Sequence, residues 1–454
     1  MLGMNKGGNM KIPQQYKGKF FYHFTHVDNI ESIVKHGLLS TNLKKSKGIG
    51  HFNVANENIQ HRRSQMPVNV GPGGVVHDYV PFYLTTVNPM LLGLLNRKNI
   101  DQQFVVFIAI SIEKILEEAV VFTDASANTL IPPRFFEKPE DLENLNWDLI
   151  NSPKWGVEEE QEIHEKMAEV LVYQRVPLEW IDSYIVFNDI SKDKIKQYYK
   201  NAGIKIPTIS YQPFNRHYFY FTKFFFANRQ DETLITGPVF LFEKYMSVVE
   251  EIVSCSKLSD VKHKTFKNID DAITKIEKDF CVIRELKGIY GLETDNSEHE
   301  CTVSEHTLKV VSALSNINYY QGLGREEQSI VKLAAYLHDI GKGPREKWAD
   351  GIQKAYSDHP ADAIPMLKRI LTEEFENVTE EQVKKLCLLV IYHDLLGDIV
   401  GKGRSEQELI NLNLNQNEFY MLVALSVADV KSINLYWASK LQENIPYFLS
   451  KVER

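Results

Sequence analysis

The sequence predicts two domains of different fold class: an α+β domain, followed by an all-helical domain. The chain has 454 residues, which is more than one domain usually holds and suggests two or three. Up to about residue 215, short aromatic and β-branched runs typical of strands alternate irregularly with helical segments. From about residue 238, apolar residues recur instead at helical spacing, and β-hairpin signals are scarce.

The strands of the first half are expected at Phe20–Thr25, Val80–Thr85, Gln103–Ser111, Val120–Thr123, Val170–Tyr173 and Tyr184–Phe187. After the first of these, Asp28 can cap a short helix that ends at Gly37, because glycine readily adopts the backbone conformation that terminates a helix. A surface helix is expected over Lys192–Lys200, behind Asp189 and Ser191. The irregular order of strands and helices favours an α+β fold over a regular βαβ arrangement.

The second half is predicted as a helical bundle because its apolar residues follow a helical period within Val331–Leu337, Leu386–Ile391 and Met421–Val430. An aromatic stretch gives way to a polar one between the halves, and the domain boundary is expected there. The predicted organisation is a flexible N-terminus at residues 1–18, an α+β domain at 19–215, a linker at 216–237 and the helical domain at 238–454.

Composition excludes several classes of protein. Hydrophobic residues make up 43% and charged residues 25%, both near the globular average, which argues against a disordered, collagen-like or disulfide-scaffold chain. The formal net charge is −8, so any nucleic-acid binding must use a local basic groove. The four cysteines form no CxxC pair, which argues against a cysteine zinc site and fits a reducing compartment. Met1–Lys11 has no apolar core, and no apolar run approaches the ~20 residues of a membrane span, so we expect a cytoplasmic protein without a membrane partner.

An ordered set of histidines and aspartates in the second half indicates a metal site. Most of these residues lie in or next to apolar helical stretches, and side chains that project inward from several helices are how a bundle holds metal ions. The six candidates are His306, His338, Asp339, His359, His393 and Asp429. A single buried histidine is more often a packed core residue, but the whole set favours a binuclear centre bridged by Asp339. Its ligands suit two divalent ions of Fe or Mn, or of Mg, Zn or Ni.

The order His…His-Asp…His…His…Asp resembles the HD superfamily of metal-dependent phosphohydrolases, over roughly residues 295–435. The resemblance implies that His306, His338, Asp339 and Asp429 form the shared metal core and that His359 and His393 are the added ligands of binuclear members. It also implies that Lys342 contacts phosphate and that a nucleotide is a possible ligand. His299 is the alternative to His306. We prefer His306, because the helical stretch Thr307–Val311 follows His306 directly. The six-ligand variant also occurs in HD-fold oxygenases, so phosphohydrolysis is favoured without being the only chemistry.

Three features of the first half need a functional explanation. Tyr22, His23 and Phe24 end a strand just before a helix, and a polar, basic loop is expected from Lys44 to Arg63. Glu169 opens an apolar strand, where a carboxylate is unfavourable unless it is paired or functional. Each feature alone also has an ordinary explanation, as a core histidine, a surface connection or a solvent-facing strand end. The length of the loop argues for function, because long loops without secondary structure are often functional.

These residues carry a second resemblance. The segments "FYHFTHVDNIESIVKHGLL" at Phe21–Leu39, "GGVVHDYVPFYLTTVNPM" at Gly73–Met90 and "MAEVLV" at Met167–Val172 resemble the DarT family. This family consists of toxins that attach ADP-ribose from NAD⁺ to a base in single-stranded DNA. The resemblance covers about residues 19–215 and implies an ADP-ribosyltransferase fold, with a role in toxin–antitoxin control or phage defence.

The DarT resemblance also assigns roles to residues. It implies that Glu169 is the catalytic glutamate and that Tyr22, His23 and Phe24 belong to the strand that holds the nicotinamide end of NAD⁺. Arg63 or Arg62 matches the catalytic arginine, with a weak preference for Arg63, and Asp124–Glu169 matches the segment that presents DNA. The chemistry agrees, because a carboxylate stabilises an oxocarbenium-like ribose and an arginine binds phosphate in bidentate fashion. The candidate cations for the DNA backbone are Lys44, Lys45, Lys47, Arg62 and Arg63.

The two resemblances together predict a two-domain enzyme. The HD domain is expected to be a hydrolase that regulates the transferase or processes its product. The alternative is a degenerate module that binds NAD or nucleic acid and serves an active HD phosphohydrolase acting on a nucleotide or on RNA. The retention of Glu169, His23 and the Arg62–Arg63 pair argues against that alternative, because a degenerate copy would be free to lose them.

Overall fold

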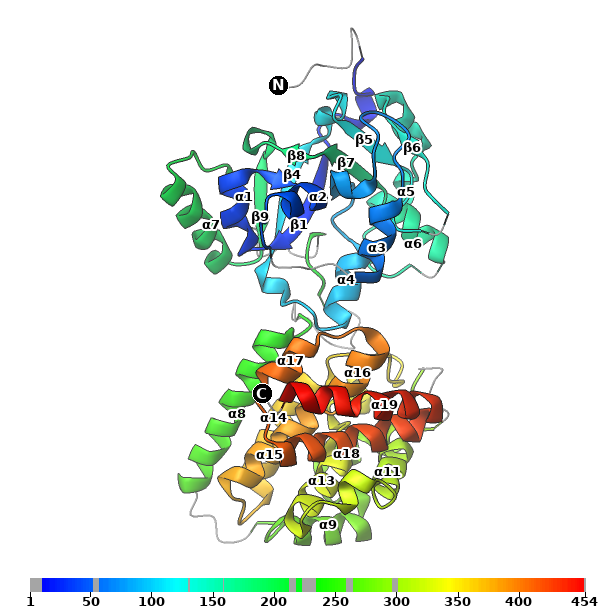
Figure 1. Ribbon diagram of the computed structural model, residues 1–454. Coiled ribbons are helices and arrows are strands. Elements are labelled where there is room, and N and C mark those ends of the chain that lie inside the picture. The colour runs from blue at the N-terminus through cyan, green and yellow to red at the C-terminus, as the bar shows by residue number, and fades with distance from the viewer. Residues whose placement is uncertain are drawn as a thin grey trace. The chain divides into compact units, whose positions relative to one another are not determined.

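The computed structural model of the chain describes residues 10–51, 57–129, 131–157, 159–211, 218–222, 234–258, 264–295 and 301–452. The chain divides into two compact units (Figure 1). The first comprises the chain up to Leu95 together with Ile100–Thr222, and the second comprises Asn96–Asn99 together with the chain from Lys223 onward. The first unit therefore continues past residue 215, where the sequence predicts the domain to end. Tyr220 is buried in it, and its hydroxyl donates a hydrogen bond to the Val105 carbonyl at 2.9 Å.

The first unit is built on an eight-stranded sheet with the order β10-β9-β4-β1-β3-β7-β5-β6. Its neighbouring strands are antiparallel except for β9 and β10, which are parallel. The strands of the sheet are β1 (Phe20–His26), β3 (Tyr79–Tyr83), β4 (Val105–Ser111), β5 (Val120–Thr123), β6 (Phe135–Phe136), β7 (Glu169–Tyr173), β9 (Ser183–Val186) and β10 (Thr208–Ser210). Two short strands, β2 (Leu38–Leu39) and β8 (Arg175–Val176), pair separately. The helices in the same part of the sequence as these strands are α1 (Asn29–His36), α2 (Thr41–Ser46), α3 (Glu57–Gln65), α4 (Pro89–Asn96), α5 (Trp147–Asn151), α6 (Glu160–Lys166) and α7 (Asp189–Ala202).

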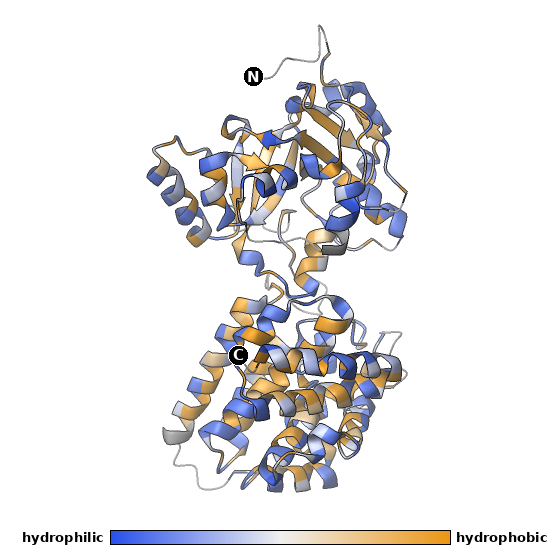
Figure 2. Cartoon of the chain, viewed as in Figure 1, coloured by the Kyte–Doolittle hydropathy of each residue, from blue (hydrophilic) through white to orange (hydrophobic). Residues whose placement is uncertain are grey.

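The strand register sets up the site. All seven residues of β1 pair with β4, whereas the described pairing of β1 with β3 is confined to Tyr22 opposite Tyr83. The two strands therefore diverge on either side of this pair. Every residue of β4 except Ser111 is buried, and Figure 2 shows the strands of the sheet as predominantly hydrophobic. Apolar side chains on both faces of the central strands thus fix the sheet within the unit.

The predicted α+β class and the predicted strand positions are confirmed, with ends that differ by one or two residues. The helix after Asp28 is present and ends at Gly37, whose φ of 77° lies where glycine is favoured, but the Asp28 side chain makes no capping hydrogen bond. The surface helix α7 begins earlier than predicted, because the Asn188 side chain caps it by accepting from the Ser191 N–H.

The prediction of a loop from Lys44 to Arg63 is wrong for its described parts, which include the end of α2 and most of α3. Ser40 caps α2 by accepting from the Leu43 N–H. The sequence of α3, ENIQHRRSQ, has no apolar face that would reveal a helix by periodicity.

The second unit is all-helical, as predicted. Its helices are α8 (Pro238–Leu258), α9 (Ile269–Lys278), α10 (Arg284–Ile289), α11 (Val303–Leu314), α12 (Asn318–Gln321), α13 (Arg325–Leu337), α14 (His359–Arg369), α15 (Glu380–Tyr392), α16 (Leu395–Lys402), α17 (Glu406–Asn411), α18 (Gln416–Ile433) and α19 (Leu435–Val452). The helix α15 is buried continuously from Lys385 to Tyr392, and α18 from Met421 to Asp429. These two helices therefore belong to the centre of the bundle, which suits them to carry side chains for an internal site. Within the described part of the chain, no helix combines the length and hydropathy that a transmembrane segment requires.

Candidate active sites in the two units

A buried ion pair between Arg63 and Glu169 is the most distinctive feature of the first unit. The Arg63 guanidinium donates through Nη1 to Glu169 Oε1 at 2.7 Å and through Nη2 to Oε2 at 2.8 Å. The backbone N–H of Ala127 donates to the same Oε1 at 2.8 Å. Glu169 is fully buried and Arg63 is 7% exposed. A buried carboxylate with this bidentate partner is held in one orientation.

Local structure explains why these two residues meet. Glu169 is the first residue of β7, and its backbone N–H donates to Thr123 Oγ1 at 3.0 Å, which joins the start of β7 to the end of β5. Arg63 projects from the last turn of α3. Burial and the Glu169 carboxylate raise the pKa of Tyr83, so its phenol remains protonated beside the ion pair.

The three β1 residues predicted to hold NAD⁺ do not share one face of the sheet. Tyr22 pairs with Tyr83, and Tyr83 pairs with Glu169, so these three side chains form a row on the same face. Phe24 lies on that face as well, stacked on Tyr83 with ring centroids 6.0 Å apart. Because successive side chains of a strand alternate, His23 points to the other face.

His23 joins β1 to β3 at the point where they diverge. Its Nδ1 lies 2.8 Å from the Pro81 carbonyl oxygen, so Nδ1 carries the proton and Nε2 is left as an acceptor. Burial lowers the pKa of His23 to about 4, which keeps the ring neutral at pH 7. The ring therefore offers the unit a neutral imidazole with a fixed tautomer.

Arg62, the alternative catalytic arginine, lies apart from Glu169. It is exposed and lines a groove of about 1000 Å³, together with residues between Asp124 and Glu165. The walls include Asn128, Pro133 and Arg134, and Ile131 at the groove is 84% exposed. Apart from Arg62, the groove is lined by residues of the segment for which the sequence predicts DNA presentation, and that role stays a prediction.

In the second unit, six predicted ligands come together from five elements. His306 lies on α11, His338 and Asp339 follow the end of α13, His359 begins α14, His393 follows α15, and Asp429 lies on α18. All six are buried. His299, the alternative to His306, lies outside the described residues.

Each of the four imidazoles is oriented by a hydrogen bond at Nδ1. The Nδ1 atoms of His338, His359 and His393 lie 2.8, 2.9 and 2.8 Å from the backbone carbonyls of Ala335, Tyr356 and Val390. Nδ1 of His306 lies 3.0 Å from the Ser432 hydroxyl, which donates its own proton to the Asp429 carbonyl. Each ring therefore carries a proton on Nδ1 and directs its Nε2 into the centre.

Asp339 bridges two groups of these nitrogens. Its Oδ2 lies 3.3 Å from His338 Nε2 and 3.6 Å from His306 Nε2. Its Oδ1 lies 3.3 Å from His359 Nε2 and 3.9 Å from His393 Nε2. Asp429 completes the first group, with Oδ1 at 2.9 Å from His306 Nε2. Two sets of nitrogen and oxygen donors therefore share one carboxylate.

The residues fit a metal centre on grounds of chemistry. Asp339 Oδ1 is buried and has no hydrogen-bond partner among the described residues, and His359 Nε2 lies 3.3 Å from it. Burial lowers the pKa of His338, but the carboxylates of Asp339 and Asp429 outweigh this effect and raise it to about 9. Both α13 and α15 end at the centre, and helix C-termini carry partial negative charge. The carboxylates and helix C-termini thus make the centre electronegative, and its imidazole nitrogens and carboxylate oxygens are common metal donors. Both features favour a bound cation.

Two more residues adjoin this centre. Lys342, in the single turn Ile340–Lys342, donates to Asp339 Oδ2 at 2.7 Å. Asp394 was not among the predicted residues, yet its two oxygens lie 3.4 Å from His359 Nε2 and 3.5 Å from His393 Nε2. The sequence did contain a signal for it, because His393–Asp394 repeats the His-Asp dipeptide of residues 338–339.

Comparisons with known proteins agree with the geometry of the first unit. Residues 22–220 match the family model described as ssDNA thymidine ADP-ribosyltransferase, DarT. The DNA ADP-ribosyl transferase of Thermus sp. (strain 2.9) is 34% identical over 174 residues, which cover 37% of this chain and 80% of the relative. The chain belongs to the DarT family.

Solved structures resemble the same part of the DarT-like chain. Thermus sp. 2.9 DarT in complex with ADP-ribosylated ssDNA has 27% identity and a TM-score of 0.40, and the match covers 45% of this chain and 98% of that one. The same Thermus protein in complex with NAD⁺ has 25% identity and a TM-score of 0.37, with the same coverage.

The second unit contains an HD domain, since residues 303–398 match the model of that domain. The matched range includes five of the six predicted ligands and also Asp394, whereas Asp429 lies beyond it. Both resemblances expected from the sequence are thereby confirmed.

Proposed function

We propose that the first unit transfers ADP-ribose from NAD⁺ to a base in single-stranded DNA, with Glu169 as catalytic residue and Arg63 as its partner. The buried, bidentate Arg63–Glu169 pair carries this proposal. The names of the related structures, which hold NAD⁺ and ADP-ribosylated DNA, support the choice of substrates. Arg62, which makes no contact with Glu169, is assigned to the DNA groove instead.

The geometry suits the bond that must break. In the reaction, the bond between the ribose C1′ and the nicotinamide nitrogen breaks, nicotinamide leaves, a bond forms between C1′ and the base, and the attacked atom of the base loses its proton to water. Positive charge develops on the ribose during this exchange, and a fixed carboxylate stabilises it. Arg63 and the Ala127 N–H hold Glu169 in place before substrate arrives, so no reorganisation of the carboxylate is needed.

The groove lined by Arg62 and by residues from Asp124 to Glu165 is the proposed path of the DNA strand. Its apolar side chains Ile131, Pro132 and Pro133 are suited to contact bases, and Arg62 is suited to contact phosphate. The predicted lysines, Lys44, Lys45 and Lys47, belong to α2 or follow it directly. These residues would give the acidic chain a local cationic surface for DNA.

The second unit is proposed as a phosphohydrolase with two divalent ions. His306, His338 and Asp429 would hold one ion, His359 and His393 the other, and Asp339 would bridge them. When bound, such ions supply Lewis acidity that activates water and neutralises phosphate. Lys342, which donates a hydrogen bond to Asp339, would contact a phosphate oxygen. We propose that this hydrolase regulates the transferase or processes its product.

The test is the intact mass of mixed-sequence single-stranded DNA after incubation with the protein and NAD⁺. The wild type is expected to add the mass of ADP-ribose, and Glu169→Gln is expected to abolish the gain. Each reaction is repeated with chelator. A larger gain with chelator would indicate that the HD domain restrains the transferase or removes its mark.

The competing function is a degenerate binding module that serves the HD hydrolase. It predicts no mass gain on DNA under any condition, together with metal-dependent hydrolysis of a nucleotide or RNA. RNA oligonucleotides in parallel reactions separate this outcome from a transferase that modifies RNA.

A further inference from the structure

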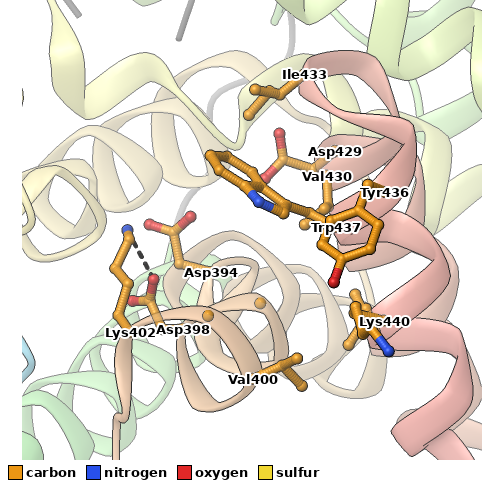
Figure 3. A pocket seen from close by; sticks show the side chains of 13 residues that line it. Asp394, Asp398, Val400, Lys402, Asp429, Val430, Ile433, Tyr436, Trp437 and Lys440 are labelled. Atoms are coloured by element: carbon orange, nitrogen blue, oxygen red, sulfur yellow. Dashed lines mark ion pairs between the residues drawn. The ribbon is translucent and has the colours of Figure 1, made fainter.

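A pocket of about 370 Å³ adjoins the metal centre in the second unit (Figure 3). Asp394 and Asp429 line it, and both lie against histidines of the centre. The rest of the lining is mostly apolar and comes from α16, α18 and α19, with Val400, Val430 and Ile433 among its walls. A ligand in this pocket can therefore reach the centre with one end while an apolar part stays in the pocket.

Trp437 is the residue best placed to hold that apolar part. Its indole extends from α19 toward the side of the pocket where Asp394 and Asp429 lie (Figure 3). The side chain is 44% exposed, and among the described residues its ring stacks on no aromatic neighbour and its indole N–H has no acceptor. Its neighbours Leu435 and Tyr436 are 71% and 66% exposed. Exposed aromatic surface of this kind, next to a polar centre, marks a binding site.

The charges around the pocket limit the number of phosphates. Lys402 is paired with Asp398 at 2.8 Å, and Lys440 is paired with Glu443 at 3.0 Å. The pocket lining sets three carboxylates, Asp394, Asp398 and Asp429, against these two lysines, so it does not favour phosphates beyond the one at the metal centre. A triphosphate needs cations beyond the centre, whereas a single phosphate can be held by the centre itself.

We propose that this pocket binds the base of a nucleotide that carries one phosphate, with the base on Trp437 and the phosphate at the metal centre. The proposal rests on the proposed phosphohydrolase and names its substrate class. Trp437 and α19 lie outside the matched HD range of 303–398, so this chain builds its base site from its own C-terminal helix. The nucleotide can be free or can be the terminal nucleotide of a strand, since both present the same chemistry.

The reaction that follows is hydrolysis of a phosphomonoester. The oxygen of water bonds to phosphorus, the ester P–O bond breaks, and the nucleoside oxygen takes up the proton. The products are a nucleoside, or a strand end with a free hydroxyl, and inorganic phosphate.

The experiment uses the full chain loaded with Mn²⁺. Phosphate release is measured from the nucleoside 5′- and 3′-monophosphates, from oligonucleotides with a terminal phosphate, and from ribose 5-phosphate, which lacks a base. Because a stacked base is lost with the aromatic ring, Trp437→Ala is expected to raise the KM for nucleotides about 5-fold or more and to leave the KM for ribose 5-phosphate unchanged. Tyr447→Ala, an exposed aromatic on the same helix outside the pocket, is the matched control and is expected to behave as wild type.

Nucleotide binding is followed separately by quenching of tryptophan fluorescence. Wild type is expected to be quenched, and Trp437→Phe is expected to lose the quenching while its KM stays within about threefold of wild type. The proposal is overturned if Trp437→Ala changes the KM for nucleotides and the KM for ribose 5-phosphate equally, or if it changes neither. Absence of all phosphate release with quenching retained would refute the hydrolase but not the base site. Absence of both would refute the base site as well. A preference for oligonucleotides over mononucleotides identifies the source as a strand end.

Discussion

Arg62 and Arg63 are neighbours of the same residue type with different surroundings. Only Arg63 reaches Glu169, through a two-point contact that a lysine ammonium does not reproduce. We expect Arg63→Lys to lower ADP-ribosylation of DNA by about 100-fold or more, because the carboxylate loses its fixed orientation. Mass spectrometry of the oligonucleotide measures the rate.

Arg62→Lys is the matched control for this prediction. It keeps the charge at the groove, and we expect its rate at saturating DNA to stay within about threefold of the wild type. Equal losses in the two variants would contradict the assignment of Arg63 as the partner of Glu169.

His23 links pH to the stability of the first unit. Its pKa is about 4 in the folded chain, against 6.5 for an ordinary histidine, so between these values the unfolded chain binds more protons. Stability therefore falls as the pH drops from 6.5 to 4, by about 3 kcal/mol from this group, and is unaffected by it above 6.5. His23→Asn, whose amide can still donate to the Pro81 carbonyl, is expected to flatten this part of the profile in urea unfolding.

The exposed His36 on α1 provides the comparison. His36→Asn leaves His23 and its contact with the Pro81 carbonyl in place, so it is expected to retain the fall in stability between pH 6.5 and 4. A profile for His23→Asn that coincides with the wild type would show that the His23 ring does not stay neutral in the folded chain.

The site residues illustrate what a sequence can predict at this scale. That the six candidate ligands gather at one place could be predicted, because each is a chemically distinctive residue in or beside an apolar helix. The choice between Arg62 and Arg63 could not, because the partner Glu169 is 106 residues away and is met only in the folded chain. Strand alternation predicts that Tyr22 and His23 lie on opposite faces of the sheet. What each side chain contacts depends on where β1 and β3 diverge, and that is seen only in the structure.

At the scale of elements, Gly341 fixes the metal centre through a close backbone approach. A Cβ at this position would lie 1.9 Å from the His359 carbonyl oxygen and 2.9 Å from the Ala363 nitrogen, both backbone atoms of α14. Gly341→Ala must therefore displace the turn that follows Asp339 from the helix that begins with His359. We expect a loss of about 3 kcal/mol or more in stability, and loss of bound metal, measured by thermal unfolding and by elemental analysis.

Gly322→Ala in the same unit is the control. A Cβ there would meet its nearest atoms at 3.5 Å, in ordinary contact. Wild-type metal content in Gly341→Ala would show that the turn and α14 can separate without harm to the centre.

The elements themselves were predictable to different degrees. Strands such as β4 and helices such as α15 and α18 bury most of their residues, so their apolar patterns identify them. The polar helix α3 has no such pattern, and the contacts described for its side chains are polar, such as the Arg63–Glu169 pair and the hydrogen bond between Gln60 and His77. A helix held by polar tertiary contacts leaves no periodic apolar signal in the sequence.

At the scale of the whole molecule, sequence order and spatial grouping differ at one segment. Asn96–Asn99 begins at the last residue of α4 but belongs to the second unit. There Lys98, 1% exposed, pairs with the fully buried Asp358 at 2.8 Å, and Asp358 also accepts from the Thr236 N–H at 3.1 Å. Asp358 directly precedes the metal candidate His359. A segment embedded in the N-terminal half of the sequence thus neutralises a buried charge beside the metal centre.

The Lys98–Asp358 ion pair predicts which unit loses stability when Lys98 is replaced. Lys98→Met removes the ion-pair partner described for the buried Asp358, and removing one partner of a buried pair typically lowers stability by about 3–5 kcal/mol. In calorimetry of the full chain, we expect the transition of the second unit to shift down, although Lys98 lies between β3 and β4 of the first unit in sequence. NAD⁺ identifies the other transition, because a ligand raises the unfolding temperature of the unit that binds it.

The double variant Lys98→Met with Asp358→Asn separates charge from packing. Removing both charges is expected to recover part of the lost stability, since the amide at position 358 can still accept from the Thr236 N–H. Asp358→Asn alone is expected to lower stability, because it leaves the buried Lys98 without this carboxylate. Lys35→Met, at an exposed position of α1, is expected to shift neither transition. If Lys98→Met instead lowered only the NAD⁺-responsive transition, Lys98 would act in the transferase unit, and the grouping of Asn96–Asn99 with the metal-binding bundle would be wrong.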